Sequence, residues 1–415
     1  MLFFYNLFIK FYAFAAFLLS FFNAKAKLWV EGRKQIIQKL QVAFTNNTHP
    51  VIWFHCASLG EFEQGRPLIE KLKIQYPKHK ILITFFSPSG YEIQKEYQGA
   101  DWIFYLPLDT VNNVKQFYEI VQPELIFFIK YEFWYHYIIE AKRRNIPLIL
   151  VSGIFRMNQP FFKWYGSLHR EMLSCFKHFF IQGQLSYNCL SIIYSKNNIT
   201  ICGDTRFDRV LEIAQTTYHN ALIENFIGND DVIVAGSTWR DDDLILDHFA
   251  NTRAEIKFII APHEIHEERI EECLRYYKNA VLYSQLEHNT KKSNILIIDN
   301  VGMLNNLYRY ATVTLVGGGF GGDGVHNVLE PAVFNKPVVI GPVYDKFREA
   351  VELVEQGGVL VVENALELEQ LIGELLLKKD YAAAVGAIAG NYVRKNAGAT
   401  DTIIDYVEAN RLLTN

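Results

Sequence analysis

A glycine-rich stretch between residues 314 and 342 carries the groups best suited to bind a ligand. It reads TLVGGGFGGDGVHNVLEPAVFNKPVVIGP and has six glycines among the eight residues from 317 to 324. Glycine has no Cβ, so this backbone can turn sharply and approach a ligand closely. A helix that begins just after such a loop directs free N–H groups at an anion. Asn327 and Glu330 would share one face of this helix, where they could bind adjacent hydroxyls. The stretch therefore predicts a nucleotide site.

Other glycine-rich sites fit this stretch less well. Gly317, Gly319 and Gly322 match G-x-G-x-x-G, but Asp323 and Gly324 delay the helix that the third glycine of a dinucleotide fingerprint should occupy. No G-K-[ST] follows, which excludes a P-loop. A glycine-rich turn before a capped helix is the structural alternative. The continuation H-N-x-x-E-P favours a nucleotide-sugar site.

Two carboxylates follow predicted strands in the first half of the chain. Glu61 ends the tetrapeptide Ser58-Leu59-Gly60-Glu61 after the strand at 51–55, and Glu132 follows the strand at 125–129. Both positions lie at the carboxyl edge of a parallel sheet, where Glu61 could act as a general base on an acceptor hydroxyl. The alternatives are structural. S-x-x-E is also the template of a capping box, and Glu132 could be a solvated carboxylate at a helix start.

The second half offers hydroxyls and acidic side chains after its first predicted strand. Ser237 and Thr238 follow that strand and suit a phosphate. The residues Asp241 to Asp243 contain D-x-D, which holds a metal ion in some sugar-transferring enzymes. Their place in the first turn of a predicted helix favours a structural role, so we predict no metal. Arg206, near the domain boundary, could reach a phosphate or form a salt bridge at the hinge.

Composition and hydrophobic patterning indicate a two-domain α/β protein. The 415 residues carry 41 Lys and Arg against 45 Asp and Glu, a balance that argues against a nucleic-acid binder. The five cysteines form no C-x-x-C pair, so neither a disulfide framework nor a zinc site is indicated. Short apolar runs alternate with helical patterns from 51 to 202 and again from 232 to 361. We therefore expect two Rossmann-like doubly wound domains that face each other across a cleft.

Two segments suggest a membrane neighbour. Residues 1–24 are mostly apolar with Lys10 as the only charge, and a basic cluster follows them, which predicts a segment that enters or crosses a bilayer with the rest of the chain in the cytoplasm. A signal peptide would carry its basic residues before the apolar run. The run 155–177 mixes Arg156, Lys163 and Arg170 with aromatic residues and suits an anionic lipid surface. Its alternative is an ordinary amphipathic helix.

In this order, the motifs resemble the membrane-associated 3-deoxy-D-manno-octulosonic acid (Kdo) transferases of lipopolysaccharide synthesis. The resemblance covers nearly the whole chain. It rests on the apolar N-terminus with Leu28-Trp29-Val30-Glu31-Gly32-Arg33, Ser58-Leu59-Gly60-Glu61, Glu132-Phe133-Trp134, residues 203–208, Gly236-Ser237-Thr238, Val316-Gly317-Gly318, His326-Asn327-x-x-Glu330 and Gly341-Pro342.

The resemblance implies a fold, a reaction and a location. The fold would be GT-B, with a membrane segment at 1–24, an acceptor domain at 25–210 and a CMP-sugar domain at 211–415 whose terminal helix returns to the first domain. The enzyme would transfer Kdo from CMP-Kdo to a lipid A precursor of the lipid IVA type. It would invert the anomeric centre without a metal or cofactor, at the cytoplasmic face of the inner membrane.

The resemblance also assigns roles to residues. Glu61 would be the general base and Glu132 the second carboxylate of the cleft. The residues expected at the nucleotide-sugar site are Arg206, Ser237, Thr238, Gly318, Gly319, His326, Asn327 and Glu330. Three positions depart from the family pattern: Trp239 and His263 stand where many members have His and Arg, and Lys130 replaces an acidic residue. A GT-B transferase that uses a UDP-sugar and an inactive membrane scaffold are the alternative functions.

Overall fold

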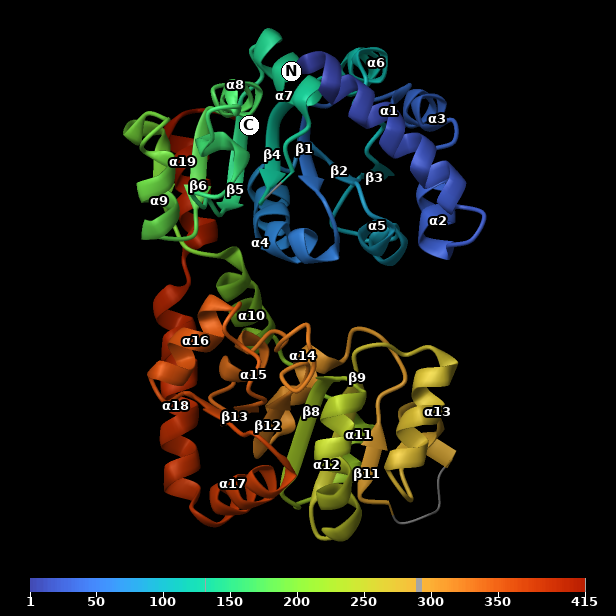
Figure 1. The fold of residues 1–415 in the computed structure, drawn as a ribbon, viewed down its shortest axis with the longest axis vertical. Coiled ribbons are helices and arrows are strands. Elements are labelled where there is room, and N and C mark those ends of the chain that lie inside the picture. The colour runs from blue at the N-terminus through green and yellow to red at the C-terminus, as the bar shows by residue number, and fades with distance from the viewer. Residues whose placement is uncertain (131, 289–292, 415) are drawn as a thin grey trace. The chain divides into compact units, whose positions relative to one another are not determined.

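Parallel strands build both halves of the chain. In the computed structural model, which describes residues 1–130, 132–288 and 293–414, the strands form two seven-stranded sheets in which every pair is parallel (Figure 1). The strand orders are β3-β2-β1-β4-β5-β6-β7 and β10-β11-β9-β8-β12-β13-β14. Residues 1–209 and 398–415 form the first compact unit, and residues 210–397 form the second. This architecture confirms the predicted α/β fold class.

The strands have the following bounds. The first sheet contains β1 (Val51–Cys56), β2 (Lys80–Phe85), β3 (Trp102–Tyr105), β4 (Pro123–Ile129), β5 (Leu148–Gly153), β6 (His178–Ile181) and β7 (Ile199–Ile201). The second contains β8 (Val232–Thr238), β9 (Lys257–Pro262), β10 (Val281–Leu282), β11 (Ile295–Ile297), β12 (Val313–Val316), β13 (Val338–Ile340) and β14 (Val359–Val361).

Helices flank the sheets. The first unit contains α1 (Leu2–Leu19), α2 (Ala24–Gly32), α3 (Ile36–Phe44), α4 (Leu59–Gln75), α5 (Pro88–Gln94), α6 (Val111–Val121), α7 (Tyr135–Arg143), η1 (Pro160–Phe162), α8 (Ser167–Leu173), α9 (Gln184–Leu190), η2 (Lys196–Asn198) and α19 (Ala399–Ala409), and α10 (Thr205–Gln215) crosses the boundary. The second contains α11 (Ala221–Ile227), α12 (Arg240–Thr252), α13 (Glu267–Tyr276), η3 (Tyr283–His288), α14 (Leu304–Leu307), η4 (Tyr308–Tyr310), α15 (Leu329–Ala332), α16 (Arg348–Glu355), α17 (Ala365–Leu377) and α18 (Lys379–Asn396).

The strands are apolar along their whole length because a hydrophobic core covers each face of each sheet. Along β1, Trp53 packs into one core and its neighbour Phe54 into the core on the opposite face, because successive side chains of a strand alternate. The last helix, α19, adds Ile403 and Val407 to the second of these cores. The end of the chain is thus part of the first domain.

One buried carboxylate connects two loops of the second domain. Asp242, in the first turn of α12, accepts hydrogen bonds from the backbone N–H of Trp239 and of Gly318, both at 2.8 Å. Its neighbour Asp243 is also buried and accepts from Arg269 and Tyr277. Both acidic side chains therefore hold the domain together, as their position in the first turn of a helix predicted. Burial raises the pKa of Asp242 to about 6.

We predict that Asp242 makes the second domain less stable as the pH rises from 4 to 6. Its pKa in the folded state lies above the ordinary value of 3.8, so the stabilising contribution is complete below that value and is lost as the pH reaches about 6. The change is on the order of 3 kcal/mol, at about 1.4 kcal/mol per pKa unit. Asp242→Asn stays neutral, so its free energy of unfolding should lack this decrease.

Calorimetry of wild type and Asp242→Asn at pH 4.5 and pH 7 measures the difference. Asp241→Asn, a neighbouring exposed carboxylate, is the matched control and should follow the wild type. A parallel pH dependence in wild type and Asp242→Asn would contradict the prediction. A constant offset between the two proteins would not, because it reports the cost of fitting the amide.

Candidate functional site

The carboxyl edge of the first sheet gathers residues from three neighbouring strands. β1 pairs with β2 on one side and with β4 on the other, all parallel, so the segments that follow these strands meet at one edge. Glu61 comes after β1, Phe86 after β2 and Glu132 after β4. The two predicted carboxylates therefore share this edge.

Glu61 lies in the first turn of α4 and is partly exposed. The hydroxyl of Ser58 donates a hydrogen bond to its carboxylate. Within the described part of the chain, the Ser58 side chain makes no capping hydrogen bond to the backbone of α4. The reciprocal bonds of a capping box are therefore not what fixes Glu61. One hydroxyl orients a carboxylate that solvent can reach, which suits a base.

Glu132 is held by an aromatic and a histidine side chain. The indole N–H of Trp134 lies 2.6 Å from the Glu132 Oε2 atom and 3.1 Å from the Nε2 atom of His55. His55 Nδ1 lies 2.9 Å from the hydroxyl oxygen of Thr84. These contacts tie Glu132 to β1 and β2, and its side chain is 21% exposed. It precedes α7 by three residues and is not part of a helix start.

Sequence reasoning missed His55. The residue is fully buried on β1, in the run VIWFHC. A polar side chain inside an otherwise apolar strand needs a hydrogen-bond partner, and this requirement is the signal that could have identified it. His55 contacts both Glu132, at 3.4 Å, and Trp134, at 3.1 Å, so it lies where it can orient the Glu132 carboxylate.

The amino-terminal helix docks on this same edge. The hydroxyl of Tyr5 donates to Asp109, which follows β3, and accepts from the backbone N–H of Tyr135 at 3.1 Å. The ring of Tyr12 lies 5.8 Å from that of Phe86, which follows β2. Figure 1 shows α1 running from the N-terminus beside α7 towards α2. Both halves of α1 are thus attached to the domain.

Arg33 fixes α2 beside α1. Its guanidinium donates to the carbonyl oxygens of Phe86 at 2.8 Å and of Leu106 at 3.0 Å, so it joins the ends of β2 and β3. The same group lies over the ring of Trp29, 4.1 Å from its centroid. Burial lowers the pKa of Arg33 to about 9, which leaves it charged at neutral pH. The planar guanidinium of arginine can bind two carbonyls and stack on a ring at the same time, which the compact ammonium group of lysine does poorly.

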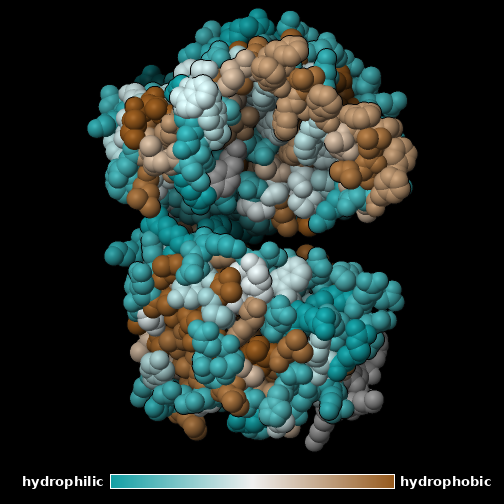
Figure 2. All heavy atoms as spheres, viewed as in Figure 1, coloured by the Kyte–Doolittle hydropathy of each residue, from teal (hydrophilic) through white to brown (hydrophobic). Residues whose placement is uncertain are grey.

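The outward face of α1 is apolar. Along this helix Ile9 is buried, whereas the exposed side chains include Phe3, Phe4, Phe8, Phe11, Phe14 and Phe17. Figure 2 shows a hydrophobic band over α1 and α2. Among the described residues α1 is the one helix long and apolar enough to cross a membrane. Such an exposed band marks an interaction surface.

The predicted lipid-facing run has a mixed outcome. Arg156 is exposed and Lys163 is partly exposed, next to Trp164, whose side chain is 92% exposed. Arg170 instead donates to the carbonyl oxygens of Phe161 at 3.0 Å and Lys163 at 2.8 Å. Arg170 therefore braces the loop. The lipid contact of Arg156 and Lys163 stays a prediction.

In the second domain the glycines serve packing. A Cβ on Gly319 would lie 2.7 Å from the backbone nitrogen of Gly341, so two chain segments touch at this point. Gly318 has a φ of +88°, which favours glycine, and its N–H already donates to Asp242. Gly317 N–H donates to the Gly236 carbonyl. The amides of Gly317 and Gly318 are therefore occupied within the protein, and the phosphate cradle expected of the loop stays a prediction.

The helix expected after the glycine loop is much shorter than the sequence suggested. α15 spans Leu329–Ala332, so Asn327 precedes it and the expectation that Asn327 and Glu330 share a helix face is wrong. The Asn327 Oδ1 atom instead accepts a hydrogen bond from the N–H of Leu329, the first residue of α15. The helix contains Pro331 and ends after one turn. The Asn327 amide donates to Glu330 at 3.0 Å. The two residues still form one polar pair.

Ser237 and Thr238 have different environments. Ser237 adopts a φ of +54° at a register shift between β8 and β9, and its side chain is partly exposed. This left-handed conformation costs about 1 kcal/mol or more for a residue with a Cβ, and such strain is common at functional sites. Thr238 is fully buried. Ser237 is therefore the hydroxyl that this turn presents at the surface.

Three aromatic rings stack next to the end of β8. Trp239 lies 4.7 Å from His263 and His263 lies 4.2 Å from His326, measured between ring centroids, and the planes are nearly parallel. The Trp239 N–H donates to Nε2 of His326 at 2.7 Å. Burial lowers the pKa of His263 and lowers that of His326 to about 4. The stack is therefore uncharged at neutral pH.

Arg206 belongs to the first domain and is paired there. Its Nε atom donates to Asp204 at 2.9 Å, and Asp204 also accepts from Gln64 and Gln182. Asp204 is buried, so this network fixes the start of α10. The structure thus shows a salt bridge near the domain boundary. Donor binding by Arg206 stays a prediction.

The sequence is similar to that of several known proteins. The model of the family described as 3-Deoxy-D-manno-octulosonic-acid transferase (kdotransferase) matches residues 33–209. A 3-deoxy-D-manno-octulosonic acid transferase of Aquifex aeolicus is 30% identical over 80% of this chain and 88% of its own length. The transferase of Haemophilus influenzae is 26% identical over 86% and 88%. A bifunctional glycosyltransferase/methyltransferase of Fusobacterium nucleatum is 30% identical over 77% of this chain, which spans about half (52%) of that relative.

Solved structures support the fold. A UDP-GlcNAc 2-epimerase of Neisseria meningitidis superposes with a TM-score of 0.61 at 16% identity and covers 86% of this chain and 100% of its own. A glycosyltransferase of Rickettsia africae gives 0.55 at 15% identity, covering 89% and 100%. These likenesses show the GT-B fold alone. The match to the Aquifex transferase decides the family: the chain belongs to the 3-deoxy-D-manno-octulosonic acid transferases, which are glycosyltransferases.

Proposed function

We propose that the protein transfers Kdo from CMP-Kdo to a lipid A precursor of the lipid IVA type at the cytoplasmic face of the inner membrane. One observation carries the proposal. Glu61, the candidate base, and α1, the apolar helix, occupy the same edge of one sheet. An acceptor with a sugar head and lipid tails needs this combination of groups. Membership of the Kdo transferase family supports the choice of sugar.

In the proposed reaction Glu61 accepts the proton of an acceptor hydroxyl. The hydroxyl oxygen bonds to the anomeric carbon of Kdo while the bond from that carbon to the phosphate oxygen of CMP breaks, which inverts the centre. Ser58 orients the Glu61 carboxylate, and His55 and Trp134 orient Glu132 beside it. A positioned base of this kind contributes roughly two to four orders of magnitude to the rate.

The donor is proposed to bind the second domain through Ser237 and the pair of Asn327 and Glu330. Ser237 presents a hydroxyl close to the start of α12, whose positive end favours a phosphate. Asp242 and Asp243 are both buried and accept hydrogen bonds from Gly318 and Tyr277, so neither carboxylate is available to bind an ion at the surface. Their burial supports a reaction without a metal.

The proposed membrane contact is a helix that lies in the surface of the bilayer. Tyr5 and Tyr12 attach α1 to the domain along its length, so a helix that crossed the bilayer would have to give up these contacts. The outward phenylalanines would enter the lipid, and Trp164 would add a second contact. This arrangement brings the base to the depth of the lipid head groups.

We predict that Glu61→Gln lowers kcat by two to four orders of magnitude with little change in stability. The amide keeps the shape and can still accept from Ser58, but it cannot take a proton. Mass spectrometry of lipid A precursor incubated with enzyme and CMP-Kdo measures the transfer, and CMP and UDP are compared as competitors. Ser58→Ala, which keeps the carboxylate, is the matched control and should lose roughly tenfold or less.

Three results would contradict this assignment. Near-normal turnover by Glu61→Gln would return that residue to a structural role. Stronger competition by UDP than by CMP would favour a UDP-sugar as the donor. Absence of transfer from CMP-Kdo by the wild type would favour the inactive membrane scaffold.

We predict that the phenylalanines on the outward face of α1 are needed for membrane binding and dispensable for chemistry. The triple variant Phe4→Ser, Phe11→Ser and Phe14→Ser keeps Tyr5, Ile9 and Tyr12, so the helix should stay docked. Burying each phenylalanine contributes about 1.5–3 kcal/mol, so flotation with anionic vesicles should be largely lost. Activity on detergent-dispersed acceptor should persist.

A matched control replaces other exposed apolar residues. Ile74→Ser, Leu366→Ser and Leu377→Ser remove three side chains that are at least as exposed but lie outside α1. This variant should float with vesicles like the wild type. Equal flotation of the α1 variant and the control would contradict the proposed contact.

A further inference from the structure

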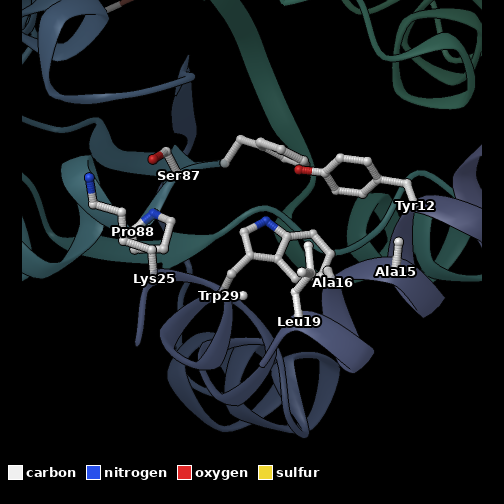
Figure 3. Close-up of a pocket in the computed structure, with 10 residues that line it drawn as sticks. Tyr12, Ala15, Ala16, Leu19, Lys25, Trp29, Ser87 and Pro88 are labelled. Carbon is white, nitrogen blue, oxygen red and sulfur yellow. The ribbon is translucent and has the colours of Figure 1, made fainter. Parts of the chain in front are cut away.

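A pocket lies between α1, α2 and the turn that follows β2. It has a volume of about 340 Å³. Tyr12, Ala15 and Leu19 line it from α1, Trp29 from α2, and Ser87 from the turn (Figure 3). Most of these side chains are apolar, and the volume lies within the range of small-ligand sites, which is about 300–1,000 Å³. The pocket therefore suits an apolar ligand with few polar groups.

One buried donor in the pocket wall lacks an acceptor. Trp29 is 7% exposed, and among the described residues its indole N–H has no hydrogen-bond partner. A buried N–H without a partner costs about 1–3 kcal/mol, so a ligand oxygen at this point would recover that cost. In Figure 3 the indole of Trp29 lies between the labelled side chains of Ser87 and Tyr12. The ligand should thus carry an oxygen acceptor next to its apolar part.

The pocket adjoins both candidate catalytic carboxylates. The ring of Phe86, which also lines the pocket, lies 4.6 Å from that of Trp134, whose N–H contacts Glu132. On the other side, the N–H of Ser87 donates to the carbonyl of Ala57, next to Ser58. Two residues of the pocket wall, Phe86 and Ser87, therefore contact the segments that hold Glu132 and Glu61. This placement favours the acceptor over an unrelated lipid.

The pocket also borders the outward apolar face of α1. Ala15 is exposed and lies beside Phe14, so one side of the pocket belongs to the helix that is proposed to lie in the bilayer. Lys25 lines the pocket too, as a cation for an anionic head group. A lipid chain could enter from the membrane without crossing water.

We propose that this pocket binds one acyl chain of the lipid acceptor, with the carbonyl or hydroxyl oxygen near the head of that chain accepting from Trp29 Nε1. This inference rests on the proposed function and adds a subsite to it. The pocket would set the position of the acceptor sugar relative to Glu61. It would also favour an acylated acceptor over a deacylated one.

The test compares two acceptors in detergent: the acylated precursor and its fully deacylated, water-soluble form. Ala15→Trp fills the pocket, and Phe14→Trp places the same residue on the neighbouring outward position as the matched control. We expect Ala15→Trp to raise KM for the acylated acceptor at least tenfold and to leave KM for the deacylated one unchanged. Phe14→Trp should change neither value.

Trp29→Phe tests the hydrogen bond separately. It keeps a ring beside Arg33 but removes the N–H, so KM for the acylated acceptor should rise roughly fivefold while kcat holds. Thermal unfolding shows whether either variant is misfolded. Should Trp29→Phe unfold early, Ala15→Trp decides, because Ala15 is exposed.

The outcomes separate the two proposals. No transfer to either acceptor by the wild type would remove the proposed function. Transfer with the same KM change on both acceptors, or with none, would remove the pocket proposal and leave the function. Loss of vesicle binding by Ala15→Trp with unchanged KM values would show that a bulk phospholipid chain, and not the acceptor, occupies the pocket.

Discussion

The parallel arrangement of the strands is the constraint on which the rest of the structure depends. All strands of a parallel sheet point the same way, and each crossover connection carries the chain back to the end at which the strands begin. The segment that directly follows each strand therefore lies at the carboxyl edge of the sheet. Segments as distant in sequence as Tyr5, Glu61 and Glu132 are collected there. Glu61 and Glu132 have partners close in sequence, Ser58 and Trp134, whereas Tyr5 contacts Asp109 and Tyr135 more than a hundred residues away. The chemistry is therefore assembled by topology, and loops can change without altering the cores beneath them.

The strands and the edge could be predicted from sequence because their physical signal is local. A strand buried on both faces must be apolar throughout, and Glu61 and Glu132 stand directly after such strands. His55 was missed because its partners, Thr84 on β2 and Trp134 just before α7, lie far from it in sequence. The length of α15 was missed because it depends on how Asn327 and Glu330 pair. The glycines were read as space for a ligand, whereas Gly319 makes room for Gly341.

The second domain shows how a chain can depart from its family pattern without losing a packed site. Trp239 and His263 replace residues that the resemblance led us to expect as cationic or polar, and together with His326 they form a stack of neutral rings. Flat aromatic surfaces favour stacking with other flat groups over attraction to anions. Trp239, His263 and His326 therefore present flat uncharged rings for stacking.

In the proposed membrane contact, the hydrogen bond between Tyr5 and Asp109 would couple bilayer binding to folding of the first domain. Because α1 is docked through this pair, the band of phenylalanines is presented correctly when the first domain is folded. A membrane that binds the folded domain more tightly than the unfolded chain stabilises it by mass action, as any ligand does. In the proposed arrangement the lipid surface would stabilise the first domain and leave the second unaffected. Moving between water and membrane would therefore shift the relative stabilities of the two halves of a single chain.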